Sequence, residues 1–343
     1  MKKKKKEKKI LYQLIFSAFL LFSNAYLVKA NSDILSQDST GKYCINTEQD
    51  YYNFIENIQN YNNKTVILCN DIDISDVPEA TSSFGGILNG KGHTITYASK
   101  EAKENIAVFP FRINDNGIVE NINVQIDESY AYNSETDEFQ TVFSQCDGIA
   151  KGITIKGNVT CIYDDEDEDV SIGAIEGNGT LMDSSIAITY DLQSEKTIEE
   201  IAEDIVENDL EFEFCQLGTT YTGITYQNCI GYGQYSEAIK SLADELEPKI
   251  EDDTWGSLYV SFTRKSFFST SASATNCYYD KENMPDIKIR SEYIANRDNN
   301  KEFPNYADFG KTTSEMKNQG TYEGFDFNKK WTISPEDNNG YPY

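Results

Sequence analysis

The chain repeats a short unit in which a glycine turn is followed by alternating apolar and polar residues. Gly117, Gly148 and Gly179 mark three such turns and stand 31 residues apart. The apolar residues that alternate after the turns are Ile122, Val124, Ile126, Ile153, Ile155, Ile186 and Ile188. A two-residue period predicts short strands with one buried face, and glycine permits the turn before each strand.

A fixed period of this size predicts stacked units rather than a closed globule. One short strand cannot bury its apolar side alone, whereas the next copy stacked on it in parallel buries a shared column of Ile and Val. We therefore predict an all-β fold, a parallel β-helix, in which Ile122, Ile153 and Ile186 line up in one column. The alternative is an antiparallel sandwich, but the two-residue hairpin turns that a sandwich favours are scarce.

Asparagines recur beside the expected strands. They are Asn121, Asn123, Asn158, Asn228 and Asn276. Stacked Asn side chains can form hydrogen-bonded ladders. Asn also tolerates the left-handed backbone region that turns require, so both interpretations stay open.

The composition divides the chain into five expected segments. They are a signal peptide (1–30), an entry and N-terminal cap (31–63), β-helix rungs (64–190), further rungs with an acidic helical insertion (191–290), and a C-terminal capping segment (291–343). The cap contains a predicted helix over 48–58, and the insertion contains two acidic helices over 194–209 and 236–247, each with an apolar stripe. These two helices either form a binding surface or cover apolar strand edges. Resumed strands are expected at 223–231, 260–262 and 275–279.

The C-terminal segment has a start signal and an apolar cluster. Thr312 and Glu315 have the spacing of a capping box, which predicts a short helix that Gly320 would stop. Phe325, Phe327 and Trp331 follow and are expected to form an apolar plug.

The first 30 residues have the pattern of a secretory signal. Seven lysines precede residue 10, an apolar run follows, and a small-residue site ends at Ala30. The apolar run is short for a bilayer span, which leaves an uncleaved anchor as the alternative. We expect a secreted or surface-located protein that is cleaved after Ala30.

Two stretches carry a resemblance to known proteins. The phrase at 84–95 (FGGILNGKGHTI) resembles the opening rung of bacterial surface proteins with GLUG-type repeats, which are related to the N-terminal β-helical region of IgA1-specific metallopeptidases. The segments 45–54 and 66–74 resemble their entry, and 311–343 resembles their terminal segment. The resemblance implies a right-handed, pectin-lyase-like solenoid on an exported protein, often with an adhesive role. It does not extend over 191–300.

The charge balance limits the partners. The leader holds 8 of the 30 basic and 1 of the 57 acidic residues, which leaves 22 and 56, a net charge of −34. Nucleic-acid binding needs basic patches, so nucleic acid is excluded as a partner. Cations, basic surfaces and neutral glycans fit this charge better than polyanions. Exposed tyrosines would suit sugar stacking or protein contact.

Seven cysteines follow the leader: Cys44, Cys69, Cys146, Cys161, Cys215, Cys229 and Cys277. The odd number leaves at least one unpaired. No CxxC spacing occurs, which argues against a zinc site. We predict that most are small apolar residues stacked inside the coil, with a possible disulfide between Cys44 and Cys69 near the entry.

The sequence names no catalytic, cofactor-binding or metal-binding residue. The acidic run 164–169 has neither a glycine turn nor EF-hand spacing and is interpreted as a solvated loop. Asp71, Asp73 and Asp76 are interpreted with the same caution, as polar residues that alternate outward from a strand. His93 is the single histidine, and its place in a repeat phrase predicts a role in a turn. The HExxH motif of zinc peptidases is absent.

We therefore expect an exported, non-catalytic, adhesin-like protein that binds a host or matrix protein or a glycan, through one lateral sheet and the acidic region 191–260. A polysaccharide lyase or glycoside hydrolase on a β-helix is the alternative, because β-helices often carry such activity. Abundant carboxylates are no evidence for it, and a fold alone does not confer activity. A structural surface spacer is the third possibility.

Overall fold

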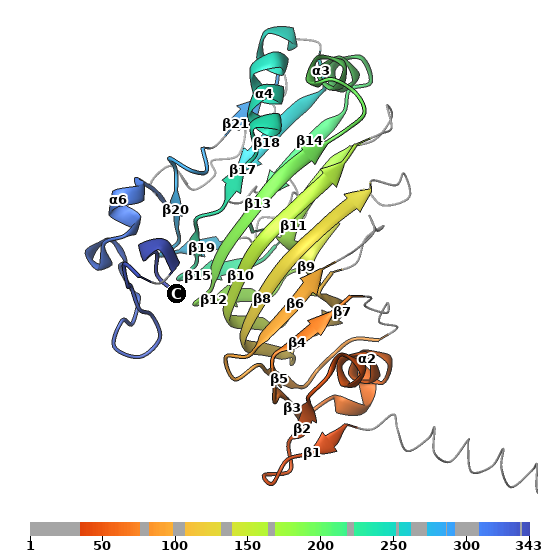
Figure 1. Ribbon diagram of the computed structural model, residues 1–343, viewed down its shortest axis with the longest axis vertical. Coiled ribbons are helices and arrows are strands. Elements are labelled where there is room, and N and C mark those ends of the chain that lie inside the picture. The colour runs from red at the N-terminus through yellow and green to blue at the C-terminus, as the bar shows by residue number, and fades with distance from the viewer. Residues whose placement is uncertain are drawn as a thin grey trace, which may run out of the picture.

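The computed structural model describes residues 35–75, 82–98, 107–131, 139–163, 169–217, 223–251, 254–261, 273–285, 287–291, 309–336 and 338–343 (Figure 1). Within these ranges the chain is mostly β, with two sheets. The expected signal peptide, Asp76 and residues 164–168 of the acidic run lie outside the described residues.

Sheet A contains 16 strands within the described ranges. They are β1 (Ser36–Gln37), β2 (Tyr43–Ile45), β3 (Thr65–Leu68), β4 (Ile72–Ile74), β5 (Ile87–Asn89), β6 (Thr94–Ala98), β8 (Ile118–Ala131), β10 (Ile149–Ile162), β12 (Thr180–Met182), β13 (Ser185–Gln193), β15 (Thr225–Gln227), β16 (Ile230–Gly231), β17 (Gln234–Tyr235), β19 (Ser273–Thr275), β20 (Tyr278–Asp280) and β22 (Gly310–Lys311).

Sheet B contains six strands of the described chain. They are β7 (Phe109–Ile113), β9 (Phe139–Cys146), β11 (Val170–Ile175), β14 (Glu211–Cys215), β18 (Ser257–Ser261) and β21 (Ile287–Ile289). Neighbouring described strands run parallel in both sheets except for the pairs β1–β2 and β18–β21. The antiparallel sandwich is therefore wrong for the body of the molecule.

The chain passes alternately between the two sheets. It runs from β6 in sheet A to β7 in sheet B, then to β8, β9, β10 and β11, which belong to sheets A, B, A and B in turn. Parallel pairing of strands that are close in sequence requires such a crossover, because the chain must return to the same end before each new strand. The expected resumed strands in 191–290 are β15, β16, β18, β19 and β20, and all of them pair in parallel with earlier strands.

The 31-residue period is a true structural register. Strand β10 pairs with β8 with Ile149 opposite Ile118, and with β12 with Ile149 opposite Thr180. Gly117, Gly148 and Gly179 consequently lie side by side. A Cβ atom on Gly148 would lie closer than 3.0 Å to the carbonyl oxygens of Gly117 and Asn114, so the backbones approach too closely for any other residue.

The predicted isoleucine column is partly wrong. Ile153 lies opposite Ile122, but Ile186 lies opposite Ile155. The register stays at 31 residues through β12 and β13, whereas Ile186 stands 33 residues after Ile153, so Ser184 takes the place next to Ile153. Its hydroxyl accepts a hydrogen bond from the backbone N–H of Ile153 (3.1 Å) and donates one to the carbonyl of Met182 (2.8 Å). A buried hydroxyl is tolerated there because both of these bonds are made.

The apolar residues of the alternating strands form one core between the sheets. Ile122, Ile126, Ile153 and Ile186 are fully buried in it. Aromatic residues fill its N-terminal part, where Phe54, Phe84 and Phe111 pack edge to face.

Three amphipathic helices pack against this core, and each lies within a range where the sequence predicts a helix. Helix α2 (Glu48–Glu56) begins at Thr47 and buries Tyr51, Phe54 and Ile55. Helices α3 (Ile198–Glu207) and α4 (Glu237–Leu246) lie together beyond the ends of β13 and β18 (Figure 1). Their apolar stripes are buried in the main core, which favours the covering role of these helices. No helix in the described ranges is long and apolar enough to cross a bilayer.

The C-terminal segment forms a second, smaller apolar cluster. Its helix α6 (Thr313–Met316) begins at Thr312 with the predicted capping box to Glu315. The helix ends at Met316, before Gly320, which instead lies in a 3-10 turn (Gln319–Thr321). Two further 3-10 turns lie at Ile58–Tyr61 and Glu247–Lys249, and a third turn lies at Asn338–Gly340. The buried cluster is Ile230, Tyr278, Met316, Tyr322, Trp331 and Tyr341, with Phe325 and Phe327 packed against it.

The cysteines follow the sequence prediction. Cys44 and Cys69 form a disulfide at the N-terminal end, with their Cα atoms 5.9 Å apart. The other five, Cys146, Cys161, Cys215, Cys229 and Cys277, are free and buried. Burial raises the pKa of the Cys146 thiol to about 12, so this thiol stays protonated and unreactive.

Replacing both Cys44 and Cys69 with serine is expected to lower the free energy of unfolding by about 2 kcal/mol, because a 25-residue separation between the cysteines then closes without a covalent link. Urea unfolding followed by circular dichroism measures this loss. Reduction of the wild-type protein with dithiothreitol should give the same loss, and the double variant should not respond to dithiothreitol. A wild-type unfolding curve that reduction leaves unchanged would contradict the prediction.

Candidate binding groove

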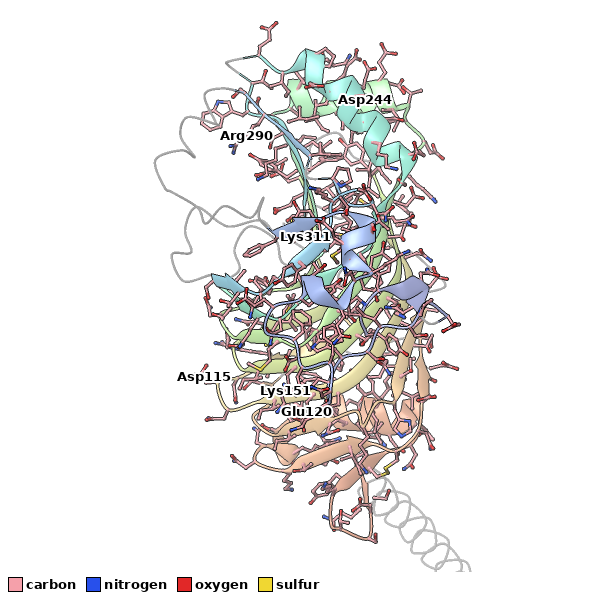
Figure 2. All side chains as sticks on the ribbon, turned by 90° about the vertical axis from the view of Figure 1, so that its left-hand side faces the viewer. Asp115, Glu120, Lys151, Asp244, Arg290 and Lys311 are labelled. Carbon is pink, nitrogen blue, oxygen red and sulfur yellow. A yellow bond between two sulfur atoms is a disulfide. The ribbon has the colours of Figure 1, made fainter. Side chains whose placement is uncertain are left out.

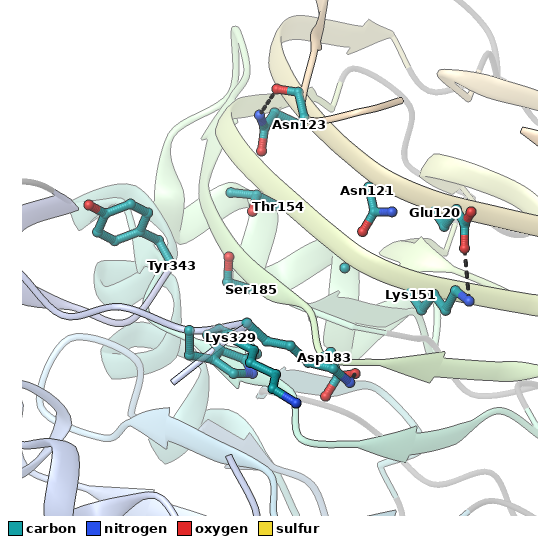
Figure 3. A pocket seen from close by; sticks show the side chains of 13 residues that line it. Glu120, Asn121, Asn123, Lys151, Thr154, Asp183, Ser185, Lys329 and Tyr343 are labelled. Atoms are coloured by element: carbon teal, nitrogen blue, oxygen red, sulfur yellow. Dashed lines mark hydrogen bonds and ion pairs between the residues drawn. The ribbon is translucent and has the colours of Figure 1, made fainter. Parts of the chain in front are cut away.

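A polar groove lies between the outward face of sheet A and the C-terminal segment (Figure 3). It consists of two adjoining cavities of about 460 and 310 Å³, and Asn123, Thr154 and Tyr343 line both. The first is further lined by Gly92, Glu120, Asn121, Lys151, Gly152, Asp183, Ser185, Lys329, Lys330 and Trp331, and the second by Thr94, Val124, Gln125 and Lys156. We call these two cavities the lateral groove.

The floor of the lateral groove is a row of polar residues from successive strands. Thr94, Asn123, Thr154 and Ser185 stand opposite one another on β6, β8, β10 and β13. They occupy the outward positions of the same two-residue alternation that buries Ile122 and Ile153. Since neighbouring strands lie about 4.8 Å apart, the row extends roughly 14 Å across the sheet.

A bend in sheet A forms one side of the groove. Asn121, Gly152 and Asp183 follow one another in register there, and each has a left-handed backbone, with φ of 54°, 62° and 50°. Asn228 and Asn276 continue the series with φ of 53° and 52°. Only glycine and short polar residues adopt this conformation at low cost.

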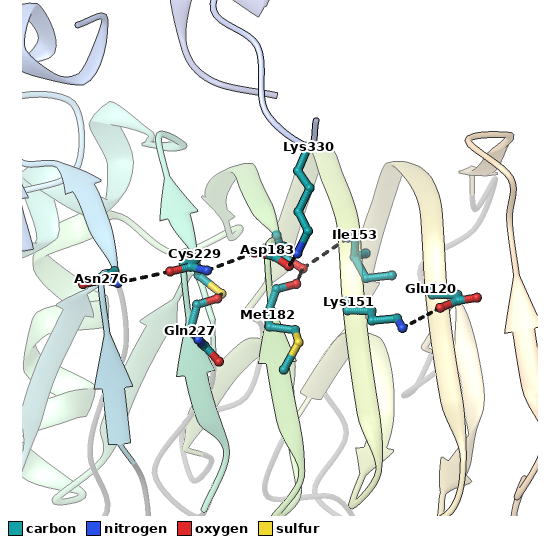
Figure 4. Close-up of polar contacts among 11 residues, drawn as sticks. Glu120, Lys151, Ile153, Met182, Asp183, Gln227, Cys229, Asn276 and Lys330 are labelled. Atoms are coloured by element: carbon teal, nitrogen blue, oxygen red, sulfur yellow. Dashed lines mark hydrogen bonds and ion pairs between the residues drawn. The ribbon is translucent and has the colours of Figure 1, made fainter. Parts of the chain in front are cut away.

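The asparagines of the bend also form the ladder considered from the sequence. Asn276 Nδ2 donates to Asn228 Oδ1 (3.3 Å), and Asn228 Nδ2 donates to Asp183 Oδ1 (3.0 Å) (Figure 4). Asn228 and Asn276 therefore adopt the left-handed backbone and also form the hydrogen-bonded ladder, so both interpretations from the sequence are confirmed for these two residues. The ladder does not extend to Asn121, because Gly152 supplies no side chain in between. Asn123 instead donates to the carbonyl of Gly92 (2.7 Å).

Each carboxylate that lines the groove is paired with a lysine. Lys151 Nζ lies 2.8 Å from Glu120, which also accepts a hydrogen bond from Asn89 Nδ2 (2.5 Å). Lys330 Nζ lies 2.5 Å from the second oxygen of Asp183, so this ion pair joins the C-terminal segment to the bend (Figure 4). Figure 2 shows the C-terminal segment crossing the face that carries Glu120 and Lys151.

The second side of the groove is held by the smaller apolar cluster. Trp331 is only 4% exposed, and its ring centroid lies 4.7 Å from that of Phe325. Its indole Nε1 has no hydrogen-bond partner among the described residues, although it is buried. Two backbone hydrogen bonds between Thr332 and Tyr343, 3.0 and 3.1 Å long, place Tyr343 beside this wall.

A buried carboxylate anchors this wall to sheet A. Asp280, at the end of β20, is fully buried and accepts hydrogen bonds from Tyr341 Oη (2.5 Å), Thr313 Oγ1 (2.8 Å) and Asn283 Nδ2 (2.9 Å). Burial alone would raise the pKa of Asp280, but these bonds and those from the backbone N–H groups of Glu282 and Asn283 lower it overall. Burial and the Asp280 charge raise the pKa of Tyr341, so the tyrosine remains a donor.

A second pair of carboxylates lies outside the lateral groove. Burial, and after it the charge of Asp147, raises the pKa of Glu176. Asp147 is itself paired with Arg112 Nε (2.6 Å). Glycosidases use a pair of carboxyl groups, but neither of these two residues lines either cavity of the groove.

The other candidate residues from the sequence lie outside the groove, in turns and strands of the N-terminal part of sheet A. Asp71 accepts a hydrogen bond from the backbone N–H of Thr94 (2.9 Å) and lies 3.0 Å from His93 Nδ1, while Asp73 points outward from β4. The described residues contain no cluster of three or more His, Cys, Asp or Glu side chains that could hold a metal ion.

The groove lies on the lateral sheet, but none of its lining residues comes from the acidic region 191–260. The sequence could have predicted that Asn123 on β8 and Thr154 on β10 are neighbours, since they stand 31 residues apart in the repeat. No repeat or motif indicated that Lys329, Trp331 and Tyr343 would line the same groove.

No protein family model, no curated protein and no solved structure matches this chain. The groove is therefore interpreted from its own geometry and charge.

Proposed function

We propose that the protein is an exported, non-catalytic β-helical protein of adhesin-like type that binds a glycan in the lateral groove at the bacterial surface. The finer fold is a right-handed parallel β-helix of the pectin-lyase-like kind. The alternation of the chain between two parallel sheets and the 31-residue register support this fold. The similarity of residues 84–95 to GLUG-type repeats agrees with it.

Two observations support export. The leader has the charge and apolar pattern of a cleaved signal. The Cys44–Cys69 disulfide is a feature of proteins that fold in an oxidising compartment.

The choice of a glycan as the ligand rests on the residues that line both cavities. Asn123 and Thr154 offer amide and hydroxyl groups along the floor, and Tyr343 offers an aromatic ring at the junction. Sugars present hydroxyl groups for hydrogen bonds and apolar ring faces for aromatic contact. An elongated polar floor with an aromatic residue above it therefore suits a glycan chain better than an apolar peptide segment, which needs a hydrophobic groove.

The charges of the groove support binding without cleavage. A hydrolase needs one protonated carboxyl group and a second free carboxylate about the scissile bond. Glu120 and Asp183 are instead each held in an ion pair with a lysine. Glycan cleavage remains the alternative function, and the Glu176–Asp147 pair is the place where it would be sought. A purely structural spacer is the third alternative.

Replacing Thr154 with methionine should weaken glycan binding at least ten-fold, because the longer side chain enters both cavities and the floor loses a hydroxyl group. The measurement is a glycan array with the mature chain, followed by titration calorimetry on the best ligand. The free energy of unfolding should change little, because Thr154 lies on the outward face of β10.

Thr275→Met is the matched control for Thr154→Met. Thr275 is an exposed residue of β19 in the same sheet and lines neither cavity. Binding that Thr154→Met leaves intact would remove the groove as the site. Incubation of the bound glycans with the protein, with detection of new reducing ends or unsaturated products, distinguishes binding from cleavage. A chain that binds no glycan would act as a spacer or bind protein.

A further inference from the structure

The lateral groove is locally basic in a strongly acidic protein. The chain after the leader has 22 basic and 56 acidic residues. Four lysines line the groove, namely Lys151, Lys156, Lys329 and Lys330, against two acidic side chains. Lys151 and Lys330 neutralise those carboxylates. Lys156 and Lys329 have no ion-pair partner within the described part of the chain.

Lys156 lies at a place where its charge is not compensated. Its register neighbours are Gln125 on β8 and Ala187 on β13, both of which are uncharged. The side chain is partly buried, and burial lowers the pKa of its amine. A lysine normally extends its ammonium group into water or pairs it with an acid. Although 56 acidic residues follow the leader, neither register neighbour of Lys156 is acidic, which leaves its charge available to a ligand.

Two ammonium groups of the groove, those of Lys156 and Lys329, have no partner among the described residues. The Ser185 hydroxyl and the Trp331 indole N–H also lack a partner there, but both atoms are buried. The two lysines belong to different cavities, and Tyr343 lies between them as a residue of both. A ligand that satisfies these donors must supply acceptors, and charged acceptors at more than one point along its length.

We propose that the lateral groove selects acidic glycans, whose anionic groups bind Lys156 in one cavity and Lys329 in the other. This inference rests on the proposed glycan-binding function. It differs from the expectation drawn from the net charge, which disfavoured polyanions. Exposed charges farther away than about 8 Å are largely screened at physiological ionic strength, so the local lysines decide what the groove accepts.

Pairs of ligands that differ only in charge test the inference. The ligands are hyaluronan and oligogalacturonate fragments with their methyl esters, and chondroitin sulfate fragments with their desulfated form, titrated calorimetrically into the mature chain. At least one acidic form should bind about ten-fold more tightly than its less charged counterpart, which corresponds to about 1.4 kcal/mol. The first two pairs report on carboxylates and the third reports on sulfates.

Variants assign the selectivity to the two lysines. Lys156→Gln and Lys329→Gln should each weaken binding of the preferred acidic glycan about ten-fold more than they weaken binding of its less charged counterpart. Lys240→Gln is the control, because Lys240 lies on α4 and lines neither cavity. Equal affinity within every ligand pair would overturn the inference and leave the proposed function standing. Failure of all six ligands, and of a neutral glycan array, would overturn both.

Discussion

Replacing Gly148 with alanine is expected to remove about 4 kcal/mol or more from the free energy of unfolding. The new Cβ atom would overlap the carbonyl oxygens of Gly117 and Asn114. Both are backbone atoms, so no side chain can rotate away. Relief requires that β10 move away from β8, with which it shares its longest run of paired residues. Typical overpacking costs about 1–3 kcal/mol, and the lack of any flexible neighbour places this substitution above that range.

Urea unfolding followed by circular dichroism measures the effect, and Gly320→Ala is the matched control. The nearest atom to a Cβ on Gly320 is a side-chain oxygen of Asn318 at 3.3 Å, and that side chain can shift. The control should therefore change the free energy of unfolding by less than about 0.5 kcal/mol. If Gly148→Ala unfolds at the same urea concentration as wild type, the close stacking of the glycines is wrong.

Replacing Asp280 with alanine should release the C-terminal wall of the groove and destabilise the protein by about 4 kcal/mol. The change leaves Tyr341, Thr313 and Asn283 without the acceptor that they share inside the protein. The wall carries Lys329, Trp331 and Tyr343, so glycan binding should be lost as well. Limited trypsin digestion measures the release, because Lys329 and Lys330 should become cleavable sites in the variant.

Asp244→Ala is the control, since Asp244 is an exposed residue of α4 (Figure 2). It should leave unfolding, trypsin cleavage and binding unchanged. Asp280→Ala protein in which the C-terminal segment is as resistant to trypsin as in wild type would refute the anchoring role.

The same carboxylate predicts the direction of a pH effect. The folded-state pKa of Asp280 is lower than its unfolded value of about 3.9, so its contribution to stability is complete above that value and is lost as pH falls through the folded-state pKa. Trypsin cannot be used at such pH, but tryptophan fluorescence should report release of Trp331 below about pH 4.

The sequence could predict the strands because their signal is local. The two-residue alternation after Gly117 and Gly148 fixes which side chains are buried, and the 31-residue spacing fixes which strands are neighbours. The expected column failed at Ile186 because this residue stands 33 residues after Ile153, and the unchanged 31-residue register places it opposite Ile155. Ser184 takes the position beside Ile153, and the hydrogen bond that its hydroxyl accepts from the Ile153 N–H could not be read from the alternation of apolar residues.

The groove depended on contacts between distant parts of the chain. Asp183 and Lys330 are 147 residues apart in sequence, and the ion pair between them brings the second wall to the sheet. Residues 325–331 were expected to form an apolar plug, and they do pack as one. That this plug would also present Lys329 and Trp331 to the outward face of β8 and β10 could not be read from periodicity. Pairing rules identify sheet neighbours, but they do not say where an irregular segment folds back.

The two antiparallel strands at the ends of the sheets have a consequence for self-association. Sheets of parallel strands can be extended by a second molecule, edge to edge, into a filament. Strand β1 pairs antiparallel with β2 at one edge of sheet A, and β21, with the exposed Lys288 at its centre, pairs antiparallel with β18 at one edge of sheet B. At these two edges another copy would meet a reversed hydrogen-bonding pattern, and at β21 also a lysine. The protein should accordingly stay dispersed at high concentration instead of assembling into fibres.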